Sequence, residues 1–347
     1  MSTYVLYIIV LLFVAAFSYF ILRNVKLTYI VIICGIIILK TFVDINSLPD
    51  LENYYSGYLE ICKLDFLRVP FGRIYTLKCP EIGFRYILKI AGCLGSFRYA
   101  LLFIAVIFAI SRINITRLYS PYIYLSILIF VCGMMQSNFV LRQHLAISLT
   151  LFSYPYIINR NFKGFIILEI LAFFCHQTAL IFLPIYFLYG VRNSKLLWGF
   201  YILLTIVLLG FFNLIINKFA IGLVGYESYF NSYKSNLTGL LLSIFYLGTF
   251  LLFLRKDAMK DGINRLILTM LLTMFCIYLT GFTFTGINRL LMYFSSCLFI
   301  CIPLILNSIM ENIVRYIIAL AYLVIIIYSS FISSNVQMYI DNFKFGF

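Results

Sequence analysis

The chain has 347 residues, of which 64% are hydrophobic and 11% charged, with a formal net charge of +14 and a mean hydropathy of +1.04. Soluble domains carry about 25% charged residues, so this chain has too few to cover a globular surface and must use lipid as its solvent. Its Lys and Arg residues are scattered between apolar runs rather than gathered on one face, which argues against a nucleic-acid partner. No Cys/His spacing predicts a metal site.

Long, continuous apolar runs follow one another along the chain. A membrane barrel would alternate polar and apolar residues, and backbone groups inside lipid must be satisfied within each segment, so these runs predict helices. The predicted spans are Tyr4–Leu22, Leu27–Val43, Tyr99–Ile110, Tyr119–Leu141, Gln143–Ile158, Phe165–Tyr189, Leu196–Ile216, Leu237–Leu254, Leu266–Ile287, Leu290–Met310 and Tyr316–Ile332. The expected fold is therefore all-α, a polytopic integral membrane helix bundle.

The first span sets the expected orientation. No positive segment precedes Tyr4–Leu22 and no small-residue cleavage site follows it, so we do not interpret it as a signal peptide. Arg23 and Lys26 come directly after it, and the positive-inside rule places these cations in the cytoplasm. The same rule assigns four short basic segments to inside loops, namely Arg112–Arg117, Asn159–Lys163, Arg192–Lys195 and Arg255–Arg265.

The run Phe165–Tyr189 can be read as one span or as two short segments that meet near His176. With two segments most of the later loop cations fall inside, whereas with one span that distribution inverts. The rule favours two segments, with Pro184 in a distorted second one. We expect about 12 membrane segments, within a range of about 10 to 13, and both termini outside.

The whole chain, residues 1–347, is expected to be a single integral membrane domain. Its one long polar segment is an extracytoplasmic loop at about residues 44–98, which carries charges of both signs. Cys62 and Cys79 fall in this oxidising loop, where they can form a disulfide or remain two free thiols.

Charged side chains close to apolar runs are the candidate functional groups, because each costs roughly 2.5–3.5 kcal/mol at a helix centre on insertion scales. They are Lys40, Arg142, His144, Glu169, His176 and Arg289. All but Glu169 lie near the expected outer ends of their segments, which indicates one outward-facing polar cavity. The alternative is that each side chain reaches the outer interface independently.

Arg142 and Arg289 suit a diphosphate, because a guanidinium is always charged and holds two oxygens at once. His176 is the natural general base, since histidine is partly neutral near pH 7. The alternative for His176 is a structural histidine that ties two half-segments together. His144 either shares the role of base or orients Arg142, and Glu169 receives no role.

The segment after the second span has the side chains that bind sugars. Asp50, Asn53 and Tyr54 combine carboxylate, amide and phenol groups, which hydrogen-bond to hydroxyls and stack on sugar faces. We expect these three residues to bind substrate, together with Gln143 and His144 beside Arg142.

At these positions the chain resembles the Wzy-type O-antigen and exopolysaccharide repeat-unit polymerases, in particular the EpsG-like family. The matching pieces, in family order, are Pro49-Asp50 with Asn53-Tyr54, Pro80-Glu81-Ile82-Gly83-Phe84 opening a helix, Leu141-Arg142-Gln143-His144, Phe174-Cys175-His176 through Pro184, and Asn288-Arg289 with Tyr293-Phe294. Two departures stand out: Lys40 replaces an arginine that the family usually has, and Pro-Glu-Ile-Gly replaces the commoner Glu-Pro-Gly.

The resemblance implies a glycosyltransferase on the outer face of the bacterial cytoplasmic (inner) membrane. Such enzymes join repeats carried on undecaprenyl diphosphate into O-antigen, capsule or exopolysaccharide. Arg142 and Arg289 would then stabilise the leaving diphosphate, His176 or Glu81 would be the base, and Lys40 would contact substrate. The donor is already activated, so neither metal nor other cofactor is expected. Expected partners are the lipid-linked donor and acceptor, membrane lipids and a chain-length regulator.

Two other functions remain open at this point. An O-antigen ligase uses similar donors but concentrates its motif in a late outer loop, whereas the long loop here is early. A flippase or transporter would bind the same lipid-linked oligosaccharide without forming a bond.

Overall fold

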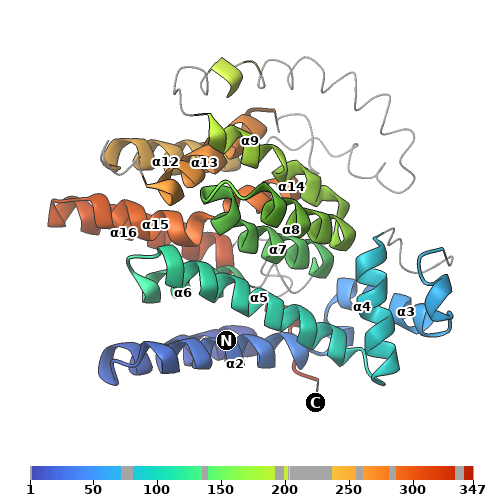
Figure 1. The fold of residues 1–347 in the computed structure, drawn as a ribbon. Coiled ribbons are helices and arrows are strands. Elements are labelled where there is room, and N and C mark those ends of the chain that lie inside the picture. Colours follow the sequence, from blue (N-terminus) through green and yellow to red (C-terminus); the bar gives the residue numbers. More distant parts are fainter. Residues whose placement is uncertain are drawn as a thin grey trace.

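The computed structural model describes residues 2–71, 81–134, 140–191, 199–201, 203, 237–254, 261–280, 287–332 and 340–346 (Figure 1). In these residues the regular elements are helices, and an isolated β-bridge joins Val43 to Phe345. The α-helices are α1 (Thr3–Ala16), α2 (Val25–Thr41), α3 (Pro49–Cys62), α4 (Ile82–Cys93), α5 (Arg98–Tyr119), α6 (Ile123–Cys132), α7 (Leu141–Ile158), α8 (Phe162–Cys175), α9 (Pro184–Gly190), α12 (Leu237–Phe253), α13 (Gly262–Thr280), α14 (Ile287–Ser295), α15 (Leu298–Ser308) and α16 (Asn312–Ile327). The predicted all-α class is confirmed.

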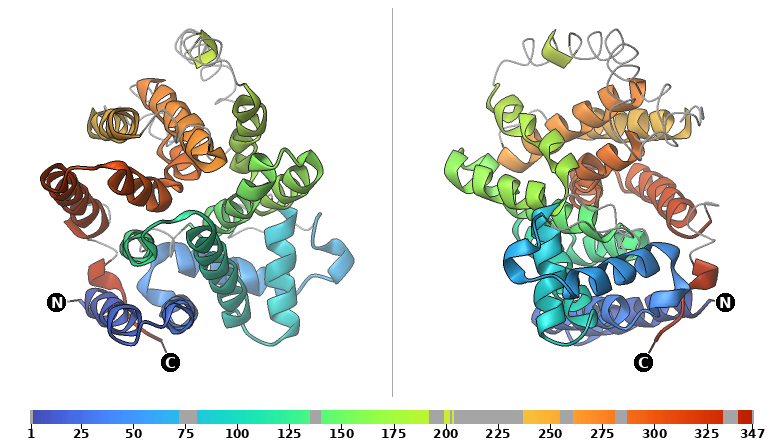
Figure 2. Two further views of the ribbon diagram at one scale, coloured as in Figure 1. Left: turned by 60° about the vertical axis from the view of Figure 1, so that its left-hand side comes forward. Right: turned by 90° about the vertical axis from the view of Figure 1, so that its right-hand side faces the viewer.

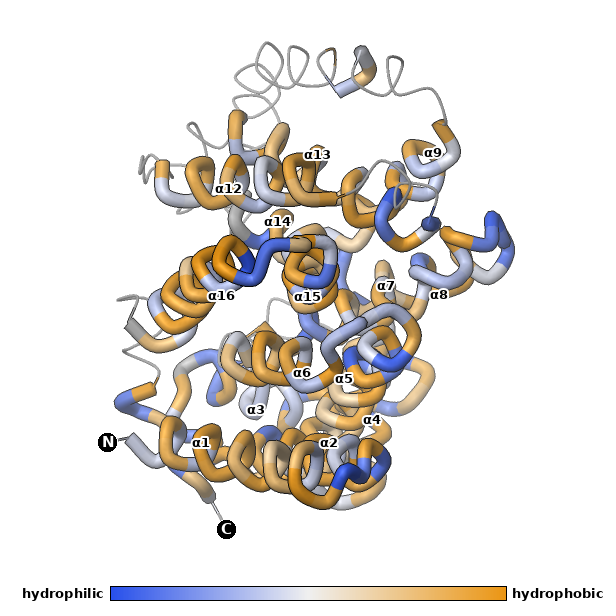
Figure 3. The backbone as a smooth tube through the Cα atoms, turned by 90° about the vertical axis from the view of Figure 1, so that its left-hand side faces the viewer, coloured by the Kyte–Doolittle hydropathy of each residue, from blue (hydrophilic) through white to orange (hydrophobic). Residues whose placement is uncertain are grey.

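Four helical stretches of the described chain are long and apolar enough to cross a membrane. They are Thr3–Ile21, Arg98–Tyr119, Gly262–Leu279 and Asn312–Phe331. A fifth is possible if α14 and α15, which are bent by 40° relative to each other, form one span. Hydrophobic residues cover these helices along most of their length (Figure 3). The total of about 12 segments stays a prediction, and the predicted span Leu196–Ile216 lies mostly outside the described residues.

The structure differs from the predicted boundaries in several places. The run Leu290–Met310 is two helices rather than one, and α6 begins at Ile123 rather than at Tyr119, where α5 ends. Part of the run Tyr119–Leu141, residues 135–139, lies outside the described residues. The predicted outer loop at 44–98 is not simply irregular, because α3 and α4 form within it and pack against each other. Cys62 of this loop carries a free thiol, and Cys79 lies outside the described residues.

The prediction of an inside loop at Arg112–Arg117 is wrong. These residues form the last turns of α5, and Arg112, Ile113, Ile115 and Thr116 are buried. The apolar residues between the two arginines continue the helical face that α5 buries, so the helix extends well past the predicted end of the run at Ile110.

Helix α7 occupies the centre of the bundle. It packs against α5, α8, α13 and α14, while α5 in turn packs against α2 (Figures 1 and 2). Most residues of α7 are buried, and a helix that is buried nearly all round belongs to the interior. Its first turn therefore presents Arg142, Gln143 and His144 to different neighbouring helices.

Candidate active site

The helical structure is interrupted at His176, as the two-segment reading of Phe165–Tyr189 predicts. Helix α8 ends at Cys175, and His176 has extended backbone with φ −160° and ψ 120°. The His176 N–H donates to the Ala172 carbonyl at 2.8 Å, which satisfies one of the orphan groups at the helix end. A 3₁₀ helix, η5 (Gln177–Phe182), follows. The break directs the His176 side chain away from the axis of α8.

Glu81 occupies the N-terminal cap of α4, yet its side chain makes no capping hydrogen bond. Its carboxylate instead accepts from two residues far away in the sequence. The His176 Nδ1 lies 2.8 Å from Glu81 Oε1, and the Arg142 Nη1 lies 2.5 Å from Glu81 Oε2. Three separate segments, before α4, at the start of α7 and at the end of α8, thus meet at one carboxylate.

The Glu81 side chain is almost fully buried, at 3% exposed. Burial raises the pKa of this carboxyl, but the hydrogen bond from His176 and the positive charge of Arg142 together outweigh burial and lower the pKa to about 2. Glu81 is therefore an anion at neutral pH. An ionised carboxylate only accepts, so the Nδ1 of His176 donates this hydrogen bond, which leaves Nε2 as the nitrogen that faces away from Glu81.

Arg142 is the most accessible member of this group, with 18% of its side chain exposed. Its guanidinium lies over the Tyr54 ring, 5.7 Å from the ring centre, in a cation–π contact. Tyr54 is buried and packs against Phe84 of α4. Tyr54 therefore packs against the Arg142 guanidinium and supports it. Because the ring is buried, it does not present an exposed face on which a sugar could stack.

Asp50 lies within the electrostatic influence of both Arg142 and the second arginine, Arg289. Burial raises the pKa of the Asp50 carboxyl, and the charges of Arg289 and Arg142 both oppose that rise. The two guanidiniums therefore act on the same half-buried carboxyl, although α7 and α14 are far apart in sequence. Gln143 reinforces this arrangement, because its Nε2 donates to the backbone carbonyl of Arg289.

Helix α14 has a second anchor near the site. The hydroxyls of Thr178 in η5 and Tyr293 in α14 lie 3.1 Å apart. Since Tyr293 follows Arg289 by about one helical turn, this contact fixes the orientation of α14 after the arginine. Sequence reasoning missed Thr178, because an isolated threonine in an apolar run gives no functional signal.

Three predicted residues lie elsewhere. Lys40 and His144 lie around the Phe108 ring together with Arg112, which sequence reasoning missed. Asn53 is exposed on α3. The charged groups that were predicted to share one cavity therefore form two clusters, one around Glu81 and one around Phe108. Within the described residues no three His, Cys, Asp or Glu side chains converge to form a metal site.

The apolar helices and the charged site buried where helix ends meet define a helical membrane protein. The chain belongs to the EpsG family, whose sequence model matches residues 47–344 and confirms the resemblance inferred from the motifs. The match includes Asp50, Glu81, Arg142, His176 and Arg289. Membership of this family points to a role in polysaccharide polymerisation. No curated protein and no solved structure is significantly similar to the chain.

Proposed function

We propose that the protein joins oligosaccharide repeats carried on undecaprenyl diphosphate into a polysaccharide, at the outer face of the bacterial cytoplasmic membrane. The observation that carries this proposal is the shared carboxylate. Glu81 contacts both His176, which has the chemistry of a general base, and Arg142, which has the chemistry of a diphosphate ligand. Base and anion ligand side by side suit transfer of a sugar from a diphosphate leaving group.

The arginines would stabilise the leaving group. A guanidinium is always charged and pairs with two phosphate oxygens in a fixed geometry. Arg142 pairs with Glu81, and Arg142 and Arg289 both oppose the rise in the pKa of the Asp50 carboxyl, so both guanidiniums already face a negatively charged region that a bound diphosphate would occupy more strongly. Negative charge that develops on the departing diphosphate would then meet two cations held in place beforehand.

The base would be His176 rather than Glu81. A carboxyl with a pKa of about 2 has little affinity for a proton at neutral pH, so it is a poor base. In the proposed step the acceptor hydroxyl gives its proton to His176 Nε2, and its oxygen bonds to the anomeric carbon of the donor. The bond from that carbon to the diphosphate breaks, and the electron pair leaves with the diphosphate. Glu81 is then a positioning residue that fixes the imidazole.

An apolar groove beside the site supports a lipid-linked substrate. It has a volume of about 390 Å³ and lies between α4, α5, α7 and α8. Ile82 and Gly83, which follow Glu81, line it together with Phe174 and Cys175, which precede His176. A prenyl chain in this groove would bring its diphosphate to the charged site, because both features share the same helix ends.

Deletion of the gene tests the proposal directly. We expect long polysaccharide chains to disappear while a single repeat is still transferred to its final acceptor. The unchanged gene and the variant Arg68→Ala should restore long chains, because Arg68 is an exposed arginine of the same outer region. Arg142→Ala should not restore them. Loss of the repeat altogether would indicate a flippase, and accumulation of unattached polymer a ligase, and either result would overturn the proposal.

A further inference from the structure

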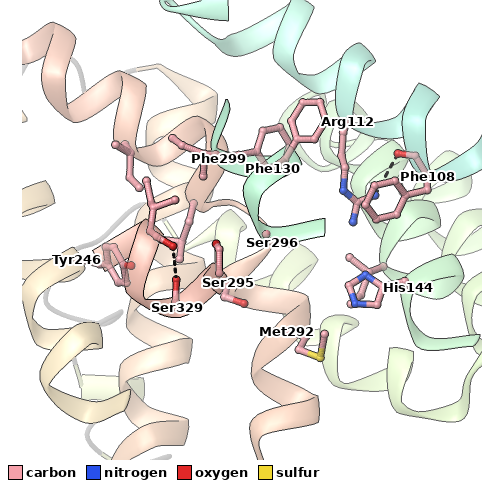
Figure 4. Close-up of a pocket in the computed structure, with 17 residues that line it drawn as sticks. Phe108, Arg112, Phe130, His144, Tyr246, Met292, Ser295, Ser296, Phe299 and Ser329 are labelled. Carbon is pink, nitrogen blue, oxygen red and sulfur yellow. Dashed lines mark hydrogen bonds between the residues drawn. The ribbon is translucent and has the colours of Figure 1, made fainter. Parts of the chain in front are cut away.

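A second cavity, of about 210 Å³, has a largely apolar lining with a few polar groups set into it (Figure 4). Several helices contribute to its lining. The polar lining residues include Arg112 of α5, His144 of α7, Ser295 at the end of α14 and Ser296 directly after it. In Figure 4 Arg112 and His144 lie together beside Phe108, while Ser329 and Tyr246 lie at the far side. His144 follows Arg142 by two residues, a rotation of about 200° on a helix, so α7 separates the two sites.

Arg112 is a buried cation whose hydrogen-bond partners are all neutral. It is 6% exposed, and its Nη1 donates to the Phe108 carbonyl at 3.2 Å, to Ser111 Oγ at 3.3 Å and to Ser148 Oγ at 3.0 Å. Its guanidinium also lies 3.5 Å from the centre of the Phe108 ring. Among the described residues no carboxylate forms an ion pair with Arg112. A buried charge without a counter-charge is costly, so an anion from outside the chain would be strongly favoured here.

Lys40 lies near the cavity but does not line it. It is 3% exposed, and its Nζ lies 4.5 Å from the centre of the Phe108 ring that also carries Arg112. Two positive side chains, from α2 and α5, therefore share one aromatic ring deep in the bundle. Because like charges repel, a second basic side chain nearby raises the cost of the Arg112 charge, which an anion beside Arg112 would offset.

His144 supplies the independent observation that points to a ligand. It is 8% exposed, lines the cavity, and neither of its ring nitrogens has a hydrogen-bond partner among the described residues. A buried polar group normally finds such a partner, because leaving it unpaired costs about 1–3 kcal/mol. A bound group that accepts a hydrogen bond from one imidazole nitrogen would remove this cost.

We propose that this cavity binds a phosphate-class oxyanion. The lining offers a guanidinium, an imidazole and serine hydroxyls as donors, and phosphate oxygens accept several such bonds at once. A polymerase of the proposed kind holds two lipid diphosphates at once, so the cavity offers a place for the second. That last assignment rests on the proposed function, whereas the oxyanion site itself does not.

Thermal unfolding of the purified full chain in neutral detergent tests the site, with inorganic diphosphate and farnesyl diphosphate as probes. The parent protein carries Arg142→Ala and Arg289→Ala, which weaken binding at the candidate active site. Both probes should raise the Tm of this parent. Adding Arg112→Met, which keeps an unbranched, flexible side chain but removes the guanidinium and its charge, should weaken probe binding at least tenfold. Adding Arg117→Met is the matched control, since Arg117 is an exposed cation of the same helix and should change nothing.

Further measurements distinguish loss of probe binding in Arg112→Met from loss of folding. Without probe, Arg112→Met should be at least as stable as the parent, because it removes an uncompensated buried charge. Arg112→Lys should restore part of the binding, and His144→Phe should weaken it several-fold. A shift with farnesyl diphosphate alone would support a lipid headgroup as the source, and a shift with both probes would support the oxyanion by itself. No shift in the parent, or equal shifts with and without Arg112, would overturn the proposal whether or not the protein polymerises repeats.

Discussion

Gly83 of α4 lies directly against the backbone of Phe174 in α8, so that a Cβ added at Gly83 would lie 2.8 Å from the Phe174 carbonyl oxygen. Gly83 comes two residues after Glu81, and Phe174 comes two residues before His176. The close approach of the two helices therefore brings the Glu81 carboxylate within 2.8 Å of the imidazole. Glycine at position 83 is therefore required for this close approach, because any side chain there would contact the Phe174 backbone.

Gly83→Ala should damage activity through geometry alone. A backbone carbonyl cannot rotate aside, so α4 must move away from α8, and overpacking of this kind costs about 1–3 kcal/mol. We expect chain growth to fall at least tenfold. We expect the free energy of unfolding to drop by about 1–3 kcal/mol. Gly248→Ala in α12 is the control, since an added Cβ meets nothing within 4 Å there. Unchanged chain growth in Gly83→Ala would contradict the role of this contact.

Glu81→Gln should abolish most chain growth, because the amide keeps the size of the side chain but loses the charge that pairs with Arg142 and His176. General base catalysis is worth about 10²–10⁴-fold, so a misoriented imidazole should lower kcat by about 100-fold or more. Glu81→Asp keeps the charge and should retain part of the activity. Steady-state kinetics of repeat transfer distinguishes the two variants. Equal activity in Glu81→Gln and the unchanged protein would exclude the positioning role.

Arg142→Lys should be nearly as defective as Arg142→Ala, because an ammonium keeps the charge but lacks the fork that holds two oxygens. The expected signature is a lower kcat/KM for the lipid-linked donor in both variants, measured against the exposed-arginine control Arg68→Ala. In combination with Glu81→Gln, the effect of Arg142→Ala should be less than additive, since the two side chains share one hydrogen bond. Full additivity would mean that the residues act separately.

Acid should weaken the fold partly through Glu81. The pKa of this carboxyl falls from an ordinary 4.5 to about 2 in the folded protein, so the unfolded chain binds the proton first as pH decreases. The stabilisation by Glu81 is thus fully present above about pH 4.5 and is lost as pH falls toward about 2. Thermal unfolding at pH 7, 5 and 3 should show the Tm difference between the unchanged protein and Glu81→Gln shrinking. A difference that stays constant across this range would contradict the depressed pKa.

Parts of the site could be predicted from local sequence patterns. The cation distribution around Phe165–Tyr189 predicted a break near His176, and the structure ends α8 at Cys175. The motif at Glu81 predicted the start of a helix, and α4 begins at Ile82. Both features depend on residues next to each other in the chain, so their signals are visible without tertiary contacts.

The division of the charged residues between two clusters could not be predicted. In the sequence Arg112 and Arg117 have the pattern of cations in an inner loop, and only the packing of α5 against α7 shows that Arg112 is buried beside His144. Similarly, Arg142 and His144 are close neighbours in sequence, yet the turn of the helix sends them to different sides of α7. The environment of a side chain within a bundle depends on its neighbours in space, which periodicity does not identify.

Chain growth by the purified protein in vesicles, supplied only with repeats linked to undecaprenyl diphosphate, tests the central claim most directly. We predict a ladder of lengthening glycans from the unchanged protein and from Arg68→Ala, and single repeats alone from His176→Ala and Arg142→Ala. Ladders of equal length from all four proteins would contradict the account, because neither the imidazole nor the guanidinium bound to Glu81 would then take part in joining the repeats.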